Sequence, residues 1–393
     1  MSITITNTRI FTGRADQPVE VGTVVVTDGL IAYVGAAASS PATDGTVIDG
    51  TGLTLLPGLV DAHSHVMMDE DDRAVPRVHN LKGDVATTLT GLWRAQKALR
   101  AGVTTLRDCM TTTQGIWALR NSFRSGQFQG PNLVLAGRAV VPSMGHMHYV
   151  SNVANGADDV RRAIREELGL GADFIKICID NYEMRDGVQF ASMQMTPDEV
   201  RSAVETAHAL GKPVTAHAVS PAGIARGLDA GVDCIEHGEQ LTPELAARMA
   251  QRGTWLVATL SVPDAAIKVV TRTPALDARM ASMKEHSSKS LRIAMDAGVR
   301  IAAGSDAGSP GNHIWDFVPE LELMHAAGMT PAAVLQSATS DACELAGIGA
   351  TTGRIEVGYA ADLLLVEGDP LEDLGTLRNV SAVIKGGTLV PLV

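Results

Sequence analysis

The middle of the chain shows a repeated pattern of short apolar runs and longer amphipathic segments. Runs typical of strands buried on both faces occur at 59–63, 104–108, 132–136, 174–179, 213–217, 234–237, 255–260 and 300–305. Segments with helical spacing lie between them, among others at 85–101, 197–210, 221–230 and 243–252, and several open on Ser-Pro or Thr-Pro. This alternation predicts an α/β fold, a (β/α)8 TIM barrel. The competing fold is an open doubly wound sheet, but the Gly-x-Gly-x-x-Gly turn expected after its first strand is absent.

The two ends of the chain differ from this pattern. Short alternating runs and turns occupy 3–10, 22–27, 30–35 and 46–56, and they return at 358–366, 380–385 and 388–390. We therefore predict a small β-sandwich module built from residues 1–57 and 352–393, next to a barrel of residues 58–351.

Charge, hydrophobicity and cysteine spacing exclude several classes of protein. The net charge is −12 and no basic cluster stands out, which argues against a nucleic-acid partner. No segment approaches the roughly 20 apolar residues of a membrane span, and the N-terminus lacks the basic region of a signal peptide. The cysteines are scattered, so buried reduced thiols are expected at Cys109, Cys178, Cys234 and Cys343. We predict a cytoplasmic protein without a membrane partner.

His63 and His65 follow the first apolar run, in Pro57-Gly58-Leu59-Val60-Asp61-Ala62-His63-Ser64-His65. Residues two apart in a strand point to the same side, so both imidazoles project together. Two nitrogen donors on one rigid face can begin a transition-metal site, although an isolated pair of this kind often arises by chance.

Four further residues capable of metal binding fall at the ends of predicted barrel strands, where active residues of barrels lie. They are Lys176, His217, His237 and Asp306. Lys176 lies in an otherwise apolar run, and a buried unpaired lysine costs several kcal/mol. It therefore needs a partner or a modification, unless it lies on an edge strand from which its amine reaches water. Each residue alone is ordinary, but together they predict a metal site.

At this point the chain resembles the amidohydrolase superfamily, in the branch of imidazolonepropionase and the metal-dependent prolidase-like dipeptidases. The resemblance covers essentially the full length. It rests on the run 57–65, Lys176, His217, Ile235-Glu236-His237-Gly238, Gly304-Ser305-Asp306 and Gly358-Tyr359-Ala360-Ala361-Asp362-Leu363.

The resemblance implies a cofactor of two divalent metal ions, expected to be Zn²⁺, bridged by a carboxylated Lys176. One metal would be held by His63, His65 and Asp306, and the other by His217 and His237. Carboxylation would also turn the buried cation into an anion that faces two cations. A hydroxide shared by the metals would attack a carbonyl, with Asp306 as general base and then general acid.

The residues after His217 bear on the type of reaction. Superfamily members that deaminate nucleobases usually have one metal and a His-x-x-Glu at this place, whereas this chain has serine at Ser220. Together with Lys176, this favours hydrolysis of an amide or peptide bond. Cleavage of lactams, esters and carbamates stays chemically open.

Substrate-binding residues are expected in the loops above the barrel. Similar enzymes have a Gly-His after the third strand, where His146 fits best and His148 is a second candidate. Tyr182 follows the fourth strand, where prolidase-like relatives tend to have a Gly-rich stretch, and His313 lies just beyond Asp306. A surface histidine in the variable loop is the alternative.

Methionines follow the first ligand pair and occur again in the loop after the third strand, as Met67, Met68, Met144 and Met147. They predict an apolar, adaptable pocket, although core packing would explain them equally well.

We predict a binuclear metal-dependent hydrolase that cleaves the amide C–N bond of a small molecule, an N-acyl amino acid or an Xaa-Pro-like dipeptide. A homo-oligomer is expected by resemblance. The alternatives are an imidazolonepropionase-like hydrolase of cyclic amides, a hydrolase of xenobiotic amides or carbamates, a mononuclear deaminase, and a non-catalytic scaffold. The scaffold would require lost ligands, but all six positions are filled.

Overall fold

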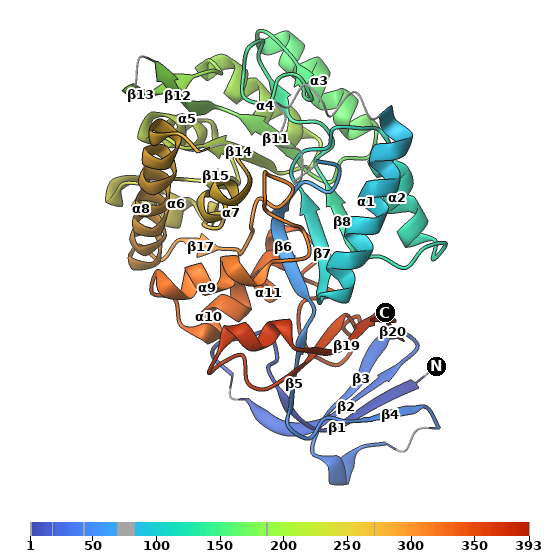
Figure 1. Cartoon of the computed structure of the whole chain (residues 1–393). Helices are drawn as coiled ribbons and strands as arrows, with labels where there is room; N and C mark the ends of the chain where they lie inside the picture. The colour runs from blue at the N-terminus through green and yellow to red at the C-terminus, as the bar shows by residue number, and fades with distance from the viewer. Residues whose placement is uncertain are drawn as a thin grey trace.

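The computed structural model describes residues 2–17, 19–41, 44–68, 83–185, 188–270 and 272–392, of which 183–185 and 188–190 by backbone alone. In this part of the chain eight strands form a parallel barrel (Figure 1). They are β6 (Leu59–Ser64), β7 (Val103–Asp108), β8 (Asn132–Leu135), β11 (Ile175–Cys178), β14 (Val214–Ala218), β15 (Cys234–His237), β16 (Trp255–Val257) and β17 (Arg300–Ile301). The Asp173 amide donates to the Leu135 carbonyl at 2.7 Å and joins β8 to β11. The predicted TIM barrel is confirmed.

The barrel closes where β6 meets the chain just after β17, a junction that we call the seam. The Asp306 amide donates to the His63 carbonyl at 2.7 Å. The carboxylate of Asp61 accepts hydrogen bonds from the Ser305 amide at 3.0 Å and the Ser305 hydroxyl at 2.5 Å. Two predicted metal ligands therefore lie directly at the seam.

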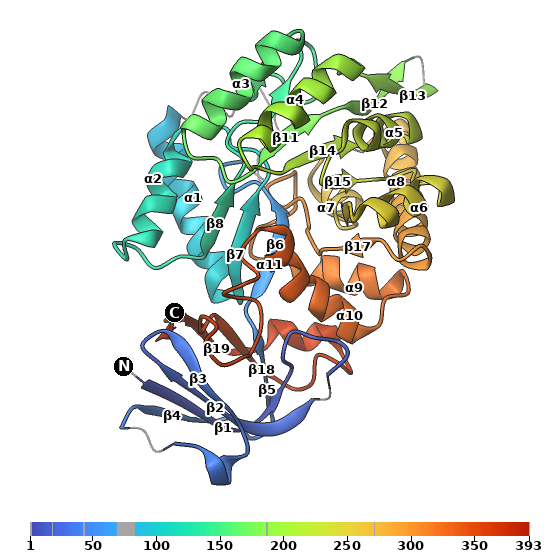
Figure 2. The same ribbon diagram turned by 180° about the vertical axis from the view of Figure 1, so that it is seen from behind.

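Helices surround the barrel on the outside (Figures 1 and 2). They are α1 (Gly83–Arg100), α2 (Gly115–Arg124), α3 (Ala157–Gly169), α4 (Pro197–Ala209), α5 (Pro221–Ala230), α6 (Pro243–Arg252), α7 (Val262–Val269), α8 (Pro274–Asp296), α9 (Val318–Ala326), α10 (Pro331–Ser337) and α11 (Ser340–Leu345). The Ser/Thr-Pro starts are explained by capping, because the side chains of Thr196, Ser220 and Thr242 each accept a backbone N–H of the first turn. Proline fits the first turn, where no helical partner is needed for its nitrogen.

Both chain ends contribute to one second sheet, which lies beside the barrel and carries both termini (Figure 1). Its strands are β1 (Ser2–Ile10), β2 (Glu20–Thr27), β3 (Leu30–Gly35), β4 (Thr46–Asp49), β5 (Leu53–Pro57), β18 (Leu363–Glu367), β19 (Val380–Lys385) and β20 (Thr388–Leu389). The order is β20-β19-β18-β5-β1-β2-β3, with β4 beside β1. The predicted sandwich of two packed sheets is not confirmed, because these strands are hydrogen-bonded in a single sheet. The proposed domain boundaries stay a prediction.

Several predicted strands are shorter in the structure. The runs 255–260 and 300–305 end as strands at Val257 and Ile301, because the chain then bends into the site. Short strands β9 (Val140–Val141) and β10 (Asn152–Val153) and the hairpin of β12 (Asp180–Arg185) and β13 (Val188–Met193) were not predicted.

All four cysteines are buried and free, as expected. Among the described residues no helix has the length and apolar character needed to cross a membrane.

Candidate metal centre

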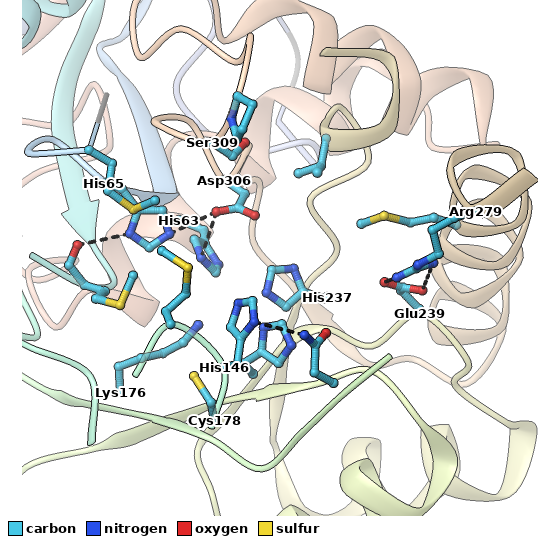
Figure 3. Close-up of a pocket in the computed structure, with 18 residues that line it drawn as sticks. His63, His65, His146, Lys176, Cys178, His237, Glu239, Arg279, Asp306 and Ser309 are labelled. Carbon is cyan, nitrogen blue, oxygen red and sulfur yellow. Dashed lines mark hydrogen bonds and ion pairs between the residues drawn. The ribbon is translucent and has the colours of Figure 1, made fainter. Parts of the chain in front are cut away.

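The barrel strands bring the six predicted ligands to one end of the barrel, around a cavity of about 240 Å³ (Figure 3). The cavity wall includes His63, His65, Lys176, His217, His237 and Asp306. The five ligands other than Asp306 are buried. The pattern of strand ends therefore identified residues that lie close together in space.

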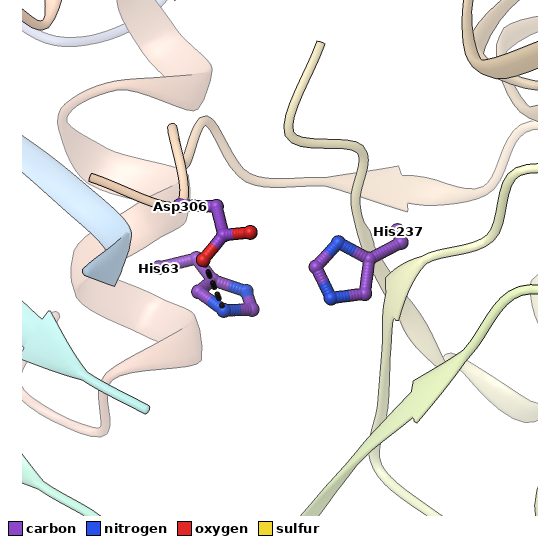
Figure 4. Close-up of side chains that lie close together, drawn as sticks. All are labelled: His63, His237 and Asp306. Carbon is purple, nitrogen blue, oxygen red and sulfur yellow. Dashed lines mark ion pairs between the residues drawn. The ribbon is translucent and has the colours of Figure 1, made fainter. Parts of the chain in front are cut away.

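Asp306 contacts the first histidine pair directly. Its Oδ1 lies 2.9 Å from Nε2 of His65 and 3.5 Å from Nε2 of His63. The ligand atoms of His63, His237 and Asp306 all lie within 4.8 Å of one another (Figure 4). Nitrogen and carboxylate donors grouped in this way match the ligand preference of zinc.

Two of these ligands have a strained backbone. His237 and Asp306 have φ angles of 70° and 58°, in the left-handed region that non-glycine residues rarely adopt. In β15 the side chain of Glu236 points into the barrel, so strict alternation would turn His237 away from it. The positive φ instead directs the imidazole to the cavity. Strain of this kind costs about 1–3 kcal/mol per residue and is concentrated at functional sites.

Each imidazole of the His63, His65 and His237 group is oriented through its Nδ1 atom. Nδ1 of His63 donates to Glu236 Oε2 at 2.7 Å, and Nδ1 of His65 donates to the Met110 carbonyl at 3.1 Å. Nδ1 of His237 is hydrogen-bonded to Thr259 Oγ1 at 2.8 Å. These bonds leave the Nε2 atoms for the cavity, which is the arrangement typical of metal-ligating histidines.

His217 has a polar atom without a protein partner. Its Nε2 is buried and has no hydrogen-bond partner. The buried side chain of Lys176 lines the same cavity. Unpaired buried polar groups are costly unless a further group binds them. The residues present therefore fit a metal centre.

The pKa values of the predicted ligands are shifted in different directions by burial and by neighbouring charges. Burial and then the positive charge of Lys176 lower the pKa of His63. Burial also lowers the pKa of His65, but the hydrogen bond and the charge of Asp306 outweigh it and raise this pKa overall. For Asp306 burial raises the pKa, but His63 and His65 outweigh burial and hold it far below the usual range. Asp306 is consequently ionised at neutral pH.

His146 is the predicted substrate-binding residue that lines the cavity. Its ring stacks on His217 with centroids 4.4 Å apart, and its Nδ1 lies 3.0 Å from Nδ2 of Asn181. Burial, followed by the charge of Lys176, lowers the pKa of His146 to about 4, so the imidazole is neutral. An amide NH₂ can only donate, so Nδ1 accepts and the proton of His146 is on Nε2.

The other three substrate-binding candidates do not line this cavity. The Nδ1 atom of His148 is hydrogen-bonded to the Gly145 carbonyl at 3.1 Å, and His313 stacks on Trp315. The Tyr182 ring lies against the guanidinium of Arg279, with 5.2 Å between Cζ and the ring centroid. Their proposed substrate contacts stay predictions.

Sequence reasoning missed several cavity residues. Asn181, Glu239 and Arg279 line the cavity, but none belongs to a motif that the sequence analysis singled out. The sequence analysis also did not identify the ion pair between Nη1 of Arg107 and Oε1 of Glu236, which are 2.8 Å apart inside the barrel.

Comparisons with known proteins agree with this geometry. The model of the amidohydrolase family matches residues 54–390. The chain belongs to the amidohydrolase family. Ochratoxinase of Aspergillus niger is 29% identical over 95% of this chain and 83% of its own length. Imidazolonepropionase of Sphingopyxis alaskensis is 26% identical over 93% of this chain and 92% of its own length. The crystal structure of a Xaa-Pro dipeptidase with methionine bound in its active site covers 99% of both chains, with a TM-score of 0.89 and 29% identity.

The resemblance inferred from the motifs is therefore confirmed, and this amidohydrolase is an enzyme of the hydrolase class. The family is generally metal-dependent, in agreement with the ligand cluster.

Proposed function

We propose that this amidohydrolase cleaves the amide C–N bond of N-acyl amino acids or Xaa-Pro-like dipeptides with two divalent metals, expected to be zinc. The observation that carries the proposal is the cluster of four imidazoles, Lys176 and Asp306 around one cavity. His63, His65 and Asp306 would hold one metal, His217 and His237 the other, and carboxylated Lys176 would bridge them. When bound, these cations polarise a carbonyl and lower the pKa of water towards neutrality.

The chain's own residues supply the proton transfers. Oδ1 of Asp306 faces Nε2 of His63 and His65, which leaves Oδ2 to take a proton from the attacking water. The same oxygen then passes that proton to the leaving nitrogen. The Nε2–H of His146 is oriented to donate to the substrate carbonyl oxygen, because Asn181 occupies Nδ1.

The similar proteins support an amino-acid substrate. The Xaa-Pro dipeptidase contains methionine, a free amino acid, in its active site. A hydrolase of cyclic amides is the second candidate, favoured by the similarity to imidazolonepropionase over 93% of the chain. Deamination is disfavoured because position 220, where nucleobase deaminases usually have a glutamate, holds a serine that caps α5.

The proposal is tested by incubating the zinc-loaded protein with N-acyl amino acids, Xaa-Pro dipeptides, lactams and carbamates, and separating the products by chromatography. We expect cleavage of the first two classes. Turnover restricted to lactams would overturn the proposal in favour of cyclic amides, and a chain without zinc or chelator-sensitive activity would be a scaffold.

The role of Lys176 is tested with Lys176→Met and with Lys268→Met as control, since Lys268 is exposed. After incubation with ¹³C-bicarbonate, the wild type and the control should show a carbamate NMR signal and bind both zinc ions. The Lys176→Met variant should show neither, and retention of both metals would contradict a bridging carbamate.

A further inference from the structure

One charged pair lies in the cavity wall away from the proposed ligands. Arg279, on α8, and Glu239, two residues after His237, form a bidentate ion pair. Nη1 of Arg279 lies 3.0 Å from Oε2 of Glu239, and Nη2 lies 2.9 Å from Oε1. Figure 3 shows the pair at one side of the cavity, separated from Asp306 and His63. None of the proposed catalytic steps uses it.

The pair presents a cation rather than an anion to the cavity. The side chain of Glu239 is 3% exposed, whereas that of Arg279 is 16% exposed. Both carboxylate oxygens of Glu239 already accept from Arg279. A guanidinium has five N–H groups, so three remain, including the edge formed by Nε and one Nη. That edge can bind a second carboxylate side-on.

Arg279 is held in position for such a contact. Its guanidinium lies over the ring of Tyr182, with 5.2 Å to the ring centroid, while Glu239 fixes the opposite end. A charge fixed in advance loses little side-chain entropy on binding. Arg279 and Met283, one turn apart on α8, line the cavity together.

The remainder of the cavity offers no competing cation. Its cationic wall residues, within the described chain, are Arg279 and Lys176, and Lys176 belongs to the proposed metal site. The apolar part of the wall includes Met68, Met110, Met147 and Met283. A substrate that fits this wall is apolar in its body and anionic at one end.

We propose that Arg279 is a specificity-determining residue that binds the free carboxylate of the amino-acid part of the substrate. This inference rests on the proposed function, because it assigns one end of the same substrate. It makes the enzyme selective for substrates with a free carboxylate over neutral amides of the same shape. An ammonium group at this end of the substrate would instead meet the positive charge of Arg279 and be repelled.

The experiment compares N-acetyl-L-phenylalanine with N-acetylphenethylamine, which has the same amide but no carboxylate. Both are tested with the zinc-loaded wild type and with the double variant Arg279→Met/Glu239→Gln, which removes the pair without leaving a buried unpaired charge. The control variant is Arg272→Gln, in an exposed ion pair with Asp277. Cleavage gives kcat/KM, and isothermal titration calorimetry gives binding of each compound.

We expect the wild type and the control to prefer the acid by roughly 10- to 100-fold in kcat/KM, mainly through KM. The double variant should lose this preference because its kcat/KM falls much more with the acid than with the neutral amide, whereas general structural damage would lower both values alike. Equal kcat/KM and equal binding of both compounds by the wild type would overturn the inference about Arg279, while the proposed amide hydrolysis would still hold. A preference for the acid that is retained in the double variant would have the same meaning. Arg279-dependent binding of the acid without cleavage of any amide would overturn the proposed function alone.

Discussion

Glu236 links the metal-ligand cluster to the barrel interior, and its charge can be removed with little change in shape. Its carboxylate is fully buried and binds Nδ1 of His63 at 2.7 Å, Nη1 of Arg107 at 2.8 Å and the hydroxyl of Thr215. Burial raises the pKa of Glu236, but its interactions with His63 and Arg107 outweigh burial and hold this pKa well below the usual range. Glu236→Gln therefore removes a full charge.

The loss of stability in Glu236→Gln follows from the buried charge that the substitution leaves without a partner. Arg107 is 2% exposed, and removing one partner of a buried ion pair costs about 3–5 kcal/mol. Glutamine has the same volume as glutamate and keeps one hydrogen-bond acceptor. We therefore expect a loss at the lower end of this range, about 3 kcal/mol of unfolding free energy. His63 also loses the acceptor that sets its tautomer, and zinc affinity should fall roughly 10- to 100-fold.

The assay is a double-mutant cycle of Glu236→Gln and Arg107→Met, with urea unfolding of the metal-free protein in chelator. The double variant should be at least about 2 kcal/mol more stable than the sum of the single effects predicts, because no charge is left unpaired. The matched control is the same cycle on Arg378 and Glu322, an exposed pair 2.5 Å apart, which should couple by about 1 kcal/mol or less. Additive effects at the buried pair, or unchanged zinc affinity of Glu236→Gln in a chelator competition, would refute the reasoning.

Three further predictions concern single residues. Asp306→Asn should keep most of its zinc but lower kcat by orders of magnitude, because it cannot take the proton; near-normal kcat with full metal would contradict the assignment. Asn181→Leu should lower kcat/KM about fivefold at unchanged zinc content, because His146 loses the donor that fixes its tautomer; an equal loss of zinc would indicate a different role. Burial raises the pKa of Glu320 from 4.5 to about 8, so between these values the native protein binds a proton that the unfolded chain has lost. The contribution of this group to the free energy of unfolding is therefore full below about pH 4.5 and is lost as the pH rises to about 8. In Glu320→Gln the measured Tm should depend less on pH over that window, and an unchanged pH dependence of Tm would argue against this role.

The proposed ligands could be found in the sequence because a barrel follows a simple positional rule. The carboxyl end of each strand meets the same end of the barrel, so His217 and Lys176 could be placed near His63 without any knowledge of distances. What could not be predicted is how His237 enters the cavity, because strand alternation directs it outward and a positive φ reverses it.

Loop and helix residues have no comparable rule. Arg279 lies on a helix 40 residues after Glu239, and only the packing of α8 against the barrel mouth brings the two together. His148 and His313 lie in loops, and their side chains are hydrogen-bonded or stacked elsewhere. Similarly, a strand pattern at both chain ends indicates shared strands but not whether they form one sheet or two.

The seam has a consequence for the order of events during folding. Asp61 and Ser305 are 244 residues apart, so the contact that closes the barrel is among the least local in the chain. Contacts over such separations form slowly, because the chain must be largely ordered before they are favourable. His63 and Asp306 lie at this closure, so a nascent chain that ends before residue 300 has only part of the ligand set. We therefore expect metal binding to accompany the final folding phase. A bound ion would then stabilise the contact between the first and the last strand of the closed barrel.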